Sequence, residues 1–117
     1  MTDNVAALRQ LLLSAPRGAL PMTYQQVASA LALTPPRTIA QVTQALEQLM
    51  REDAALQKPF IAALVISRRG DGLPAAGFFE LAVALGRFPA DTAQQEAAYR
   101  AEFQCALNER ESADKNH

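Results

Sequence analysis

The sequence predicts a mainly α-helical fold with a small antiparallel β wing, an α+β arrangement. Two helical patterns separated by a turn occupy residues 23–52, and a continuous apolar run follows at residues 60–66. A glycine-containing reversal at residues 70–72 then predicts a hairpin. The order of short helix, turn, longer helix, strand and hairpin is that of a winged helix-turn-helix, and we expect extra C-terminal helices after it.

Length and composition predict a single domain. With 117 residues, 50% hydrophobic and 20% charged, the chain resembles an ordinary soluble globular protein that can bury a core. We expect one winged-helix domain over residues 1–110 and a polar, disordered tail over residues 111–117. The N-terminal apolar run covers only residues 11–13, which is too short for a secretory signal or a membrane span. A cytoplasmic protein without a membrane partner is therefore expected.

Charge is distributed unevenly along the chain. Residues 1–70 carry 7 basic and 4 acidic side chains, a net charge of +3, whereas residues 71–117 carry 4 basic and 8 acidic ones, a net charge of −4. One interpretation is that the helix-turn-helix half faces a polyanion. The other is that small domains vary this much by chance.

Capping signals and apolar spacing predict the helices. A first helix is expected at residues 4–14, and Thr23 and Gln26 form a capping box that begins the second. A third is expected over about residues 36–52, because Pro36 is favourable in a first turn. The remaining helices are expected at residues 78–86 and over about residues 91–109.

The apolar run at residues 60–66 is expected to form a buried strand. It is short for a helix and β-branched at its end. It should pack against the apolar faces of the second and third helices. The predicted core consists of Val27, Ile39, Val42, Leu46, Leu64, Val65, Ile66 and Phe79.

Polar side chains on the third helix and cations in the predicted wing are candidate DNA contacts. Arg37, Gln41 and Gln44 lie on the face opposite the apolar stripe, where amides and guanidinium groups suit base edges and phosphates. Arg68 and Arg69 lie at the tip of the predicted wing, where they would meet a phosphate backbone. The alternative is that both surfaces are simply solvated.

Residue patterns for catalysis and for metal or cofactor binding are missing from the sequence. The only histidine is His117, the last residue, and the only cysteine is Cys105, so no histidine or thiolate metal site can be built within one chain. Cys105 is expected to be a small buried hydrophobe rather than a nucleophile. The carboxylates are scattered, with no pair that looks desolvated. We therefore expect no enzyme activity, no cofactor and no metal.

A combination of short motifs suggests a family. The stretch TYQQVA at residues 23–28 is followed by a turn that contains Pro36, by Val42, and by the apolar strand and glycine-containing hairpin. In this combination about half of the chain resembles the winged-helix DNA-binding domain of the DNA alkyltransferases that repair alkylated guanine. The resemblance implies that Tyr24, which opens the second helix, helps to rotate a target nucleotide and that this first turn rests on a phosphate.

The chain departs from that family at two positions. The arginine that fills the space of the flipped base corresponds to Ala40, with Arg37 one turn earlier. The family's reactive cysteine, in a Pro-Cys-His-Arg motif, aligns with Ala62 in the stretch 61–64. The resemblance therefore implies DNA binding without alkyl transfer.

Two functions remain open from the sequence. The first is a non-enzymatic DNA-binding protein with duplex DNA as its partner, such as a transcriptional regulator. The second is a protein-interaction or dimerisation module, for example a homodimer, in which the last helix presents Tyr99 and Phe103 to a partner. A positive surface strip would favour DNA, and a continuous apolar patch on the last helix would favour a protein partner.

Overall fold

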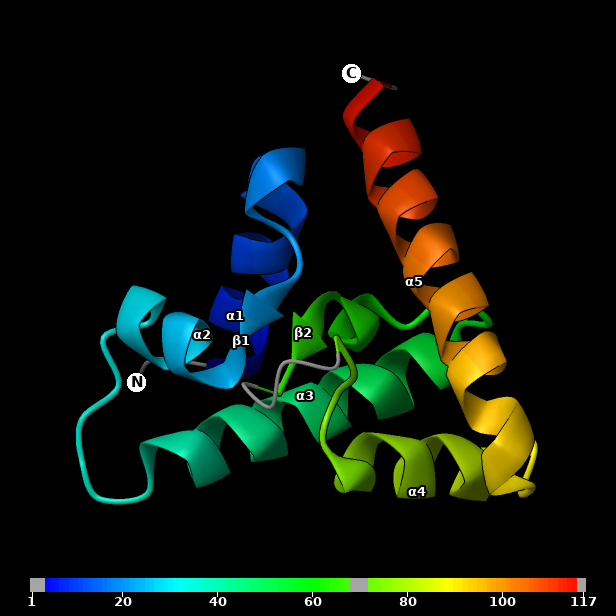
Figure 1. Cartoon of the computed structure of the whole chain (residues 1–117). Helices are drawn as coiled ribbons and strands as arrows, with labels where there is room; N and C mark the ends of the chain where they lie inside the picture. Colours follow the sequence, from blue (N-terminus) through cyan, green and yellow to red (C-terminus); the bar gives the residue numbers. More distant parts are fainter. Residues whose placement is uncertain (1–3, 68–71, 116–117) are drawn as a thin grey trace.

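The computed structural model describes residues 4–67 and 72–115 of the chain. Over these residues, five α-helices surround two short 3₁₀ helices and two short strands (Figure 1). In chain order the elements are α1 (Asn4–Ser14), η1 (Arg17–Ala19), β1 (Met22–Thr23), α2 (Tyr24–Ala30), α3 (Thr38–Ala55), η2 (Ile61–Leu64), β2 (Val65–Ile66), α4 (Ala76–Ala84) and α5 (Thr92–Lys115). No helix in these two ranges is long and apolar enough to cross a membrane.

The predicted antiparallel wing is wrong. The chain is mainly helical, and β1 pairs with β2 in parallel, with Met22 opposite Val65. The two strands run in the same direction because α2 and α3 lie between them and return the chain to the start of the sheet. The described part of the chain therefore forms five helices and a two-stranded parallel sheet, not a winged helix-turn-helix.

The chain reverses after β2, but no paired strand follows among the described residues. The Ser67 N–H donates to the Leu73 carbonyl at 2.9 Å. The next residue, Pro74, is fully buried and has no N–H to donate to a strand partner. Arg68 and Arg69, expected at the tip of the wing, lie outside the described residues.

Most of the apolar run at residues 60–66 is a 3₁₀ helix rather than a strand. η2 occupies Ile61–Leu64, and β2 is limited to Val65–Ile66. The Ala63 N–H donates to the Phe60 carbonyl at 3.0 Å as the 3₁₀ turn begins. Helices α1, α3 and α5 all contact η2, so the run is apolar because it is surrounded by helices and not because it lies inside a sheet.

Local signals predicted the first helix and the start of the second correctly, whereas α2 ends at Ala30, before the predicted stop at residues 34–36. α1 spans Asn4–Ser14, and the capping box of α2 is confirmed. The Thr23 hydroxyl accepts the Gln26 N–H at 3.1 Å, and the Gln26 side chain accepts the Thr23 N–H at 2.8 Å. α3 begins later than predicted, at Thr38, because Arg37 has a φ of 63°, outside the right-handed helical region.

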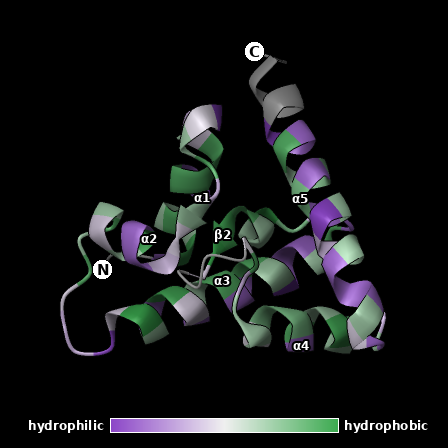
Figure 2. Cartoon of the chain, in the orientation of Figure 1, coloured by the Kyte–Doolittle hydropathy of each residue, from purple (hydrophilic) through white to green (hydrophobic). Residues whose placement is uncertain are grey.

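The core is centred on η2 and on the apolar face of α3. Figure 2 shows hydrophobic residues on β2 and on the adjacent part of α1, and many hydrophilic residues along α5. Ile39 is half-buried and lies outside the core cluster, so its predicted place in the core is wrong. Two other predicted core residues, Ile66 and Phe79, pack against the cluster half-buried. The predicted core residues that are buried are Val27, Val42, Leu46, Leu64 and Val65.

Polar contacts hold α5 against η2 and the segment before it. The Tyr99 hydroxyl donates to the Ala63 carbonyl at 2.7 Å, and burial raises the pKa of Tyr99 above its ordinary value. The Glu102 carboxylate accepts the Phe60 N–H at 2.6 Å and pairs with Arg87 at 2.9 Å. These bonds fix α5 against η2 and Phe60, and the helix continues past its predicted end to Lys115.

Candidate nucleic-acid interface

The loop that joins α2 to α3 is held by one side chain. The Gln41 amide nitrogen donates to the Thr34 carbonyl at 3.1 Å and to the Pro36 carbonyl at 3.2 Å. Both amide hydrogens of Gln41 are therefore used inside the protein, which leaves its carbonyl oxygen for an external donor. Gln44, one turn further along α3, is exposed.

Arg37 occupies the N-terminal end of α3. It is exposed, it is the N-cap residue, and its backbone is left-handed. The first turn of α3 contains no acidic residue. The guanidinium charge and the unpaired N–H groups of the helix start therefore lie in one place, and both favour an anion such as phosphate.

Tyr24 links α2 to the segment before α4. Its side chain is half-buried, and its hydroxyl oxygen accepts the Ala75 N–H at 2.9 Å. The same side chain lines a cavity of about 60 Å³ between α2, α3, η2 and α4. The residues lining it are Tyr24, Thr43, Leu46, Glu47, Met50, Ala62, Ala75, Gly77 and Phe78.

Ala62 lies in the wall of the same cavity. It is buried in η2 and contributes only a methyl group. Polar side-chain groups in the lining come from Tyr24, Thr43 and Glu47, and the Thr43 hydroxyl donates to the Ile39 carbonyl at 3.0 Å. The cavity is thus mainly apolar with one carboxylate, and its described lining contains no thiol or imidazole that could accept an alkyl group.

The structure brings some of the sequence-predicted site residues together and leaves others apart. Tyr24 and Ala62, which the resemblance identifies as site positions, line one cavity. Arg37, Gln41 and Gln44 do not line it. Arg37 and Gln41 lie nearer the start of α3, whereas Gln44 falls between the lining residues Thr43 and Leu46 in the sequence. Arg68 and Arg69 lie outside the described residues.

Sequence reasoning missed a buried carboxylate. Asp53 is 1% exposed, pairs with Arg9 at 2.9 Å and accepts the Ile61 N–H at 3.1 Å. The signal was present, because residue 53 continues the spacing of Leu46 and Leu49 along the buried stripe of α3. The prediction for Cys105 was also wrong, because this residue was expected to be buried and is exposed on α5.

Comparison of the chain with models of protein families, with curated proteins and with solved structures finds no match. Among the described residues, no group of three or more His, Cys, Asp or Glu side chains is arranged to hold a metal ion.

Incubation with DNA that contains alkylated guanine is expected to leave the protein unmodified. In the alignment that the resemblance implies, Ala62 takes the place of the alkyltransferase cysteine, and a methyl group cannot act as a nucleophile. Cys105 lies on α5 and does not line the cavity. Intact-mass spectrometry checks this expectation, and stoichiometric addition of an alkyl group at Cys105 would overturn the alignment that puts Ala62 in the cysteine's place.

Proposed function

We propose that this protein is a non-enzymatic DNA-binding protein that contacts duplex DNA with the α2–α3 side of the molecule. Such a role is consistent with a transcriptional regulator that works in the cytoplasm. The partner is duplex DNA, and no cofactor is needed. This proposal keeps the resemblance to the DNA-binding domain of the guanine alkyltransferases and does not require a β wing.

The observation that carries the proposal is that Tyr24 and Ala62 line the same cavity. In the alkyltransferases a tyrosine rotates the nucleotide and a cysteine receives the alkyl group, so the two positions must meet at the target base. Tyr24 and Ala62 belong to α2 and η2, which are separated in the sequence by the whole of α3. Their convergence is what the resemblance requires.

The start of α3 supplies a second supporting observation. Arg37 is exposed beside the positive end of an 18-residue helix whose first turn lacks acidic residues. A phosphate there would gain both a guanidinium partner and helix N–H groups. Gln41 binds two loop carbonyls just before Arg37, those of Thr34 and Pro36, so the backbone that leads into Arg37 is held in place.

The interaction-module alternative has less support. Tyr99 is 2% exposed and bonded to η2, so it is part of the protein's own core rather than of a free surface. Among the described residues, the large hydrophobic side chains that are exposed are Leu13 and Leu56, and neither lies on α5. A continuous apolar patch on α5 was the feature that would have favoured a protein partner.

Replacing Arg37 with Asn is expected to weaken duplex binding and to reduce the slope of log affinity against log salt by about 0.9, because one phosphate contact is lost. Asn tolerates the left-handed backbone at this position, so the fold is retained. Fluorescence anisotropy with a labelled duplex of random sequence measures both quantities.

Changing Arg68 and Arg69 together to Ala is expected to reduce the magnitude of the same slope of log affinity against log salt by up to about two.

Arg100→Gln is the matched control for these variants. Arg100 is an exposed arginine on α5 that pairs with Glu96 at 3.2 Å, and it lies outside the proposed contact. Its replacement removes the same charge but should leave the slope unchanged. Equal loss of affinity from Arg37→Asn and Arg100→Gln would mean that net charge, and not the α2–α3 side, determines binding.

A further inference from the structure

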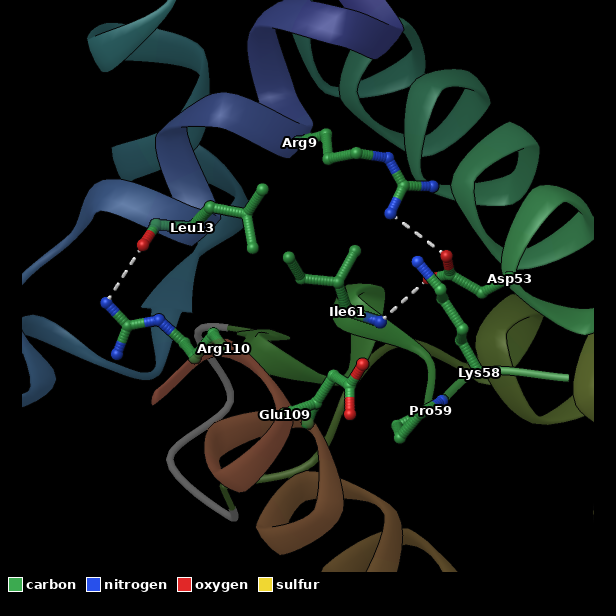
Figure 3. Close-up of a pocket in the computed structure, with 9 residues that line it drawn as sticks. Arg9, Leu13, Asp53, Lys58, Pro59, Ile61, Glu109 and Arg110 are labelled. Carbon is green, nitrogen blue, oxygen red and sulfur yellow. Dashed lines mark hydrogen bonds and ion pairs between the residues drawn. The ribbon is translucent and has the colours of Figure 1, made fainter. Parts of the chain in front are cut away.

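A second cavity lies between α1, α3, η2 and α5, away from the cavity that Tyr24 lines. In Figure 1, α1 and α5 both rise above α3 on either side of η2 and β2. The cavity has a volume of about 190 Å³, and Figure 3 shows the residues around it. These residues are Arg9, Leu13, Asp53, Lys58, Pro59, Ile61, Ala106, Glu109 and Arg110.

Two of the charges in this cavity neutralise each other. Arg9 donates to one oxygen of Asp53 at 2.9 Å, and the Ile61 N–H donates to the other at 3.1 Å. Arg9 also pairs with Glu52 at 3.1 Å. Asp53 and Arg9 therefore have the partners they need and form a fixed polar wall, visible as dashed contacts in Figure 3.

Arg110 is also committed to the fold. One terminal nitrogen of its guanidinium donates to the Leu13 carbonyl at 3.3 Å and to the Ala15 carbonyl, which fastens α5 to the end of α1. Its Nε atom is buried and has no partner in the described part of the chain. The bonds from Arg110 to α1 help to keep the cavity walls in place.

Lys58 and Glu109 remain as opposite charges without a fixed partner. Both are exposed, and neither forms an ion pair with another described residue. They approach the cavity from the segment after α3 and from α5, respectively (Figure 3). The apolar side chains of Leu13, Ile61 and Ala106 also line the cavity. Counting only contacts among residues 4–67 and 72–110, the cavity thus presents one free cation, one free anion and an apolar surface.

We propose that this cavity binds a small zwitterion of the α-amino acid class. Its ammonium group would donate to the Glu109 carboxylate, and its carboxylate would accept from the Lys58 ammonium group. An apolar side chain would contact Ile61 and Ala106. A volume of 190 Å³ is below the roughly 300–1,000 Å³ of sites for drug-sized ligands, which limits the ligand to a small molecule.

A zwitterion fits these charges better than a simple anion or cation. An anion would be attracted by Lys58 but repelled by Glu109, and a cation would be attracted by Glu109 but repelled by Lys58. A molecule with both charges satisfies both side chains and leaves no charge unpaired. This proposal does not depend on DNA binding, because the two cavities share no lining residue.

The test is a titration of the full chain with L-valine, followed by the amide resonances of Leu13, Ile61 and Ala106 in two-dimensional NMR spectra. L-Valinamide, which keeps only the ammonium group, and N-acetyl-L-valine, which keeps only the carboxylate, are the matched probes. We expect saturable shifts with L-valine at these residues and at least about five-fold weaker binding of either derivative, because each loses one charged hydrogen bond.

Variants at the two free charges give a second, independent readout. Lys58→Met should weaken the binding of L-valine but leave the binding of L-valinamide unchanged. Glu109→Gln should weaken the binding of L-valine but should not weaken the binding of N-acetyl-L-valine. Both side chains are exposed, so neither change should disturb folding. Arg100→Gln is the control and should change nothing.

The proposal is overturned if L-valine causes no saturable shift at the cavity residues. It is also overturned if all three probes bind with equal affinity, because Lys58 and Glu109 would then not contribute to recognition of the ligand. A loss of L-valine binding in Arg100→Gln equal to that in Lys58→Met would place the contact outside the cavity. Failure of DNA binding would leave the cavity proposal standing, since the two measurements use different ligands.

Discussion

Replacing Asp53 with Ala is expected to lower the free energy of unfolding by about 3 kcal/mol. The carboxylate is 1% exposed and joins three elements, because it pairs with Arg9 of α1 and accepts the Ile61 N–H of η2. Its removal leaves a buried backbone donor without an acceptor and an arginine without its close partner. The arginine side chain is 29% exposed, so water recovers part of its solvation and the cost stays at the low end of the range for buried pairs.

Urea denaturation of Asp53→Ala and of Glu52→Ala measures this effect with a control on the same helix. Glu52 also pairs with Arg9, but its side chain is 41% exposed, so its loss should cost less than about 1 kcal/mol. If the two variants lost the same stability, the pair between Asp53 and Arg9 would not be the link that joins α1 to α3.

Replacing Phe60 with Ala is expected to cost about 3–5 kcal/mol of stability. The ring is fully buried, lies edge-on to Phe78 with centroids 6.0 Å apart, and is covered by the Arg87 guanidinium 4.3 Å from its centroid. It is also near Phe88, with centroids 6.4 Å apart. Its loss would therefore leave a cavity where α4 and the segment after it meet the residue that precedes η2.

Chemical denaturation of Leu56→Ala gives the reference for this large effect. Leu56 ends α3 and is 64% exposed, so the same kind of truncation should change stability by less than about 0.5 kcal/mol. A cost for Phe60→Ala as small as that for Leu56→Ala would contradict the aromatic cluster around η2.

The sequence was most informative where structure depends on neighbouring residues. The Thr23 and Gln26 capping box is a contact within one helical turn, and it occurs as predicted. The bounds of α1 follow from apolar spacing in the same way. The start of α3 was missed because the left-handed backbone of Arg37 is not a conformation that the residue type itself favours.

Pairing and burial between distant segments could not be deduced from local patterns. An apolar run such as residues 60–66 is compatible with a strand or with a 3₁₀ turn surrounded by helices, and the helices decided the outcome. The direction of β1 relative to β2 depends on how α2 and α3 return the chain. The burial of Asp53 depends on the arrival of Arg9 from α1, which no local pattern reveals.

For the candidate site, the two positions supplied by the family resemblance, Tyr24 and Ala62, line one cavity. The positions chosen for their polar character are less uniform. Gln41 is used to hold the α2–α3 loop, because the Thr34 and Pro36 carbonyls turn towards it. Polarity on a helix face indicates exposure, but it does not tell whether a side chain serves a ligand or its own loop.

The most direct test of DNA binding by this protein is a titration of the intact chain against random-sequence duplex DNA at about 50 and 200 mM salt. If Arg37, Arg68 and Arg69 each meet one phosphate, the slope of log affinity against log salt is about −2.7, which corresponds to roughly 40-fold weaker binding at the higher salt. We expect saturable binding at micromolar protein concentration, with this loss of affinity at the higher salt. Absence of binding at the lower salt concentration would contradict the proposed function and leave only the fold.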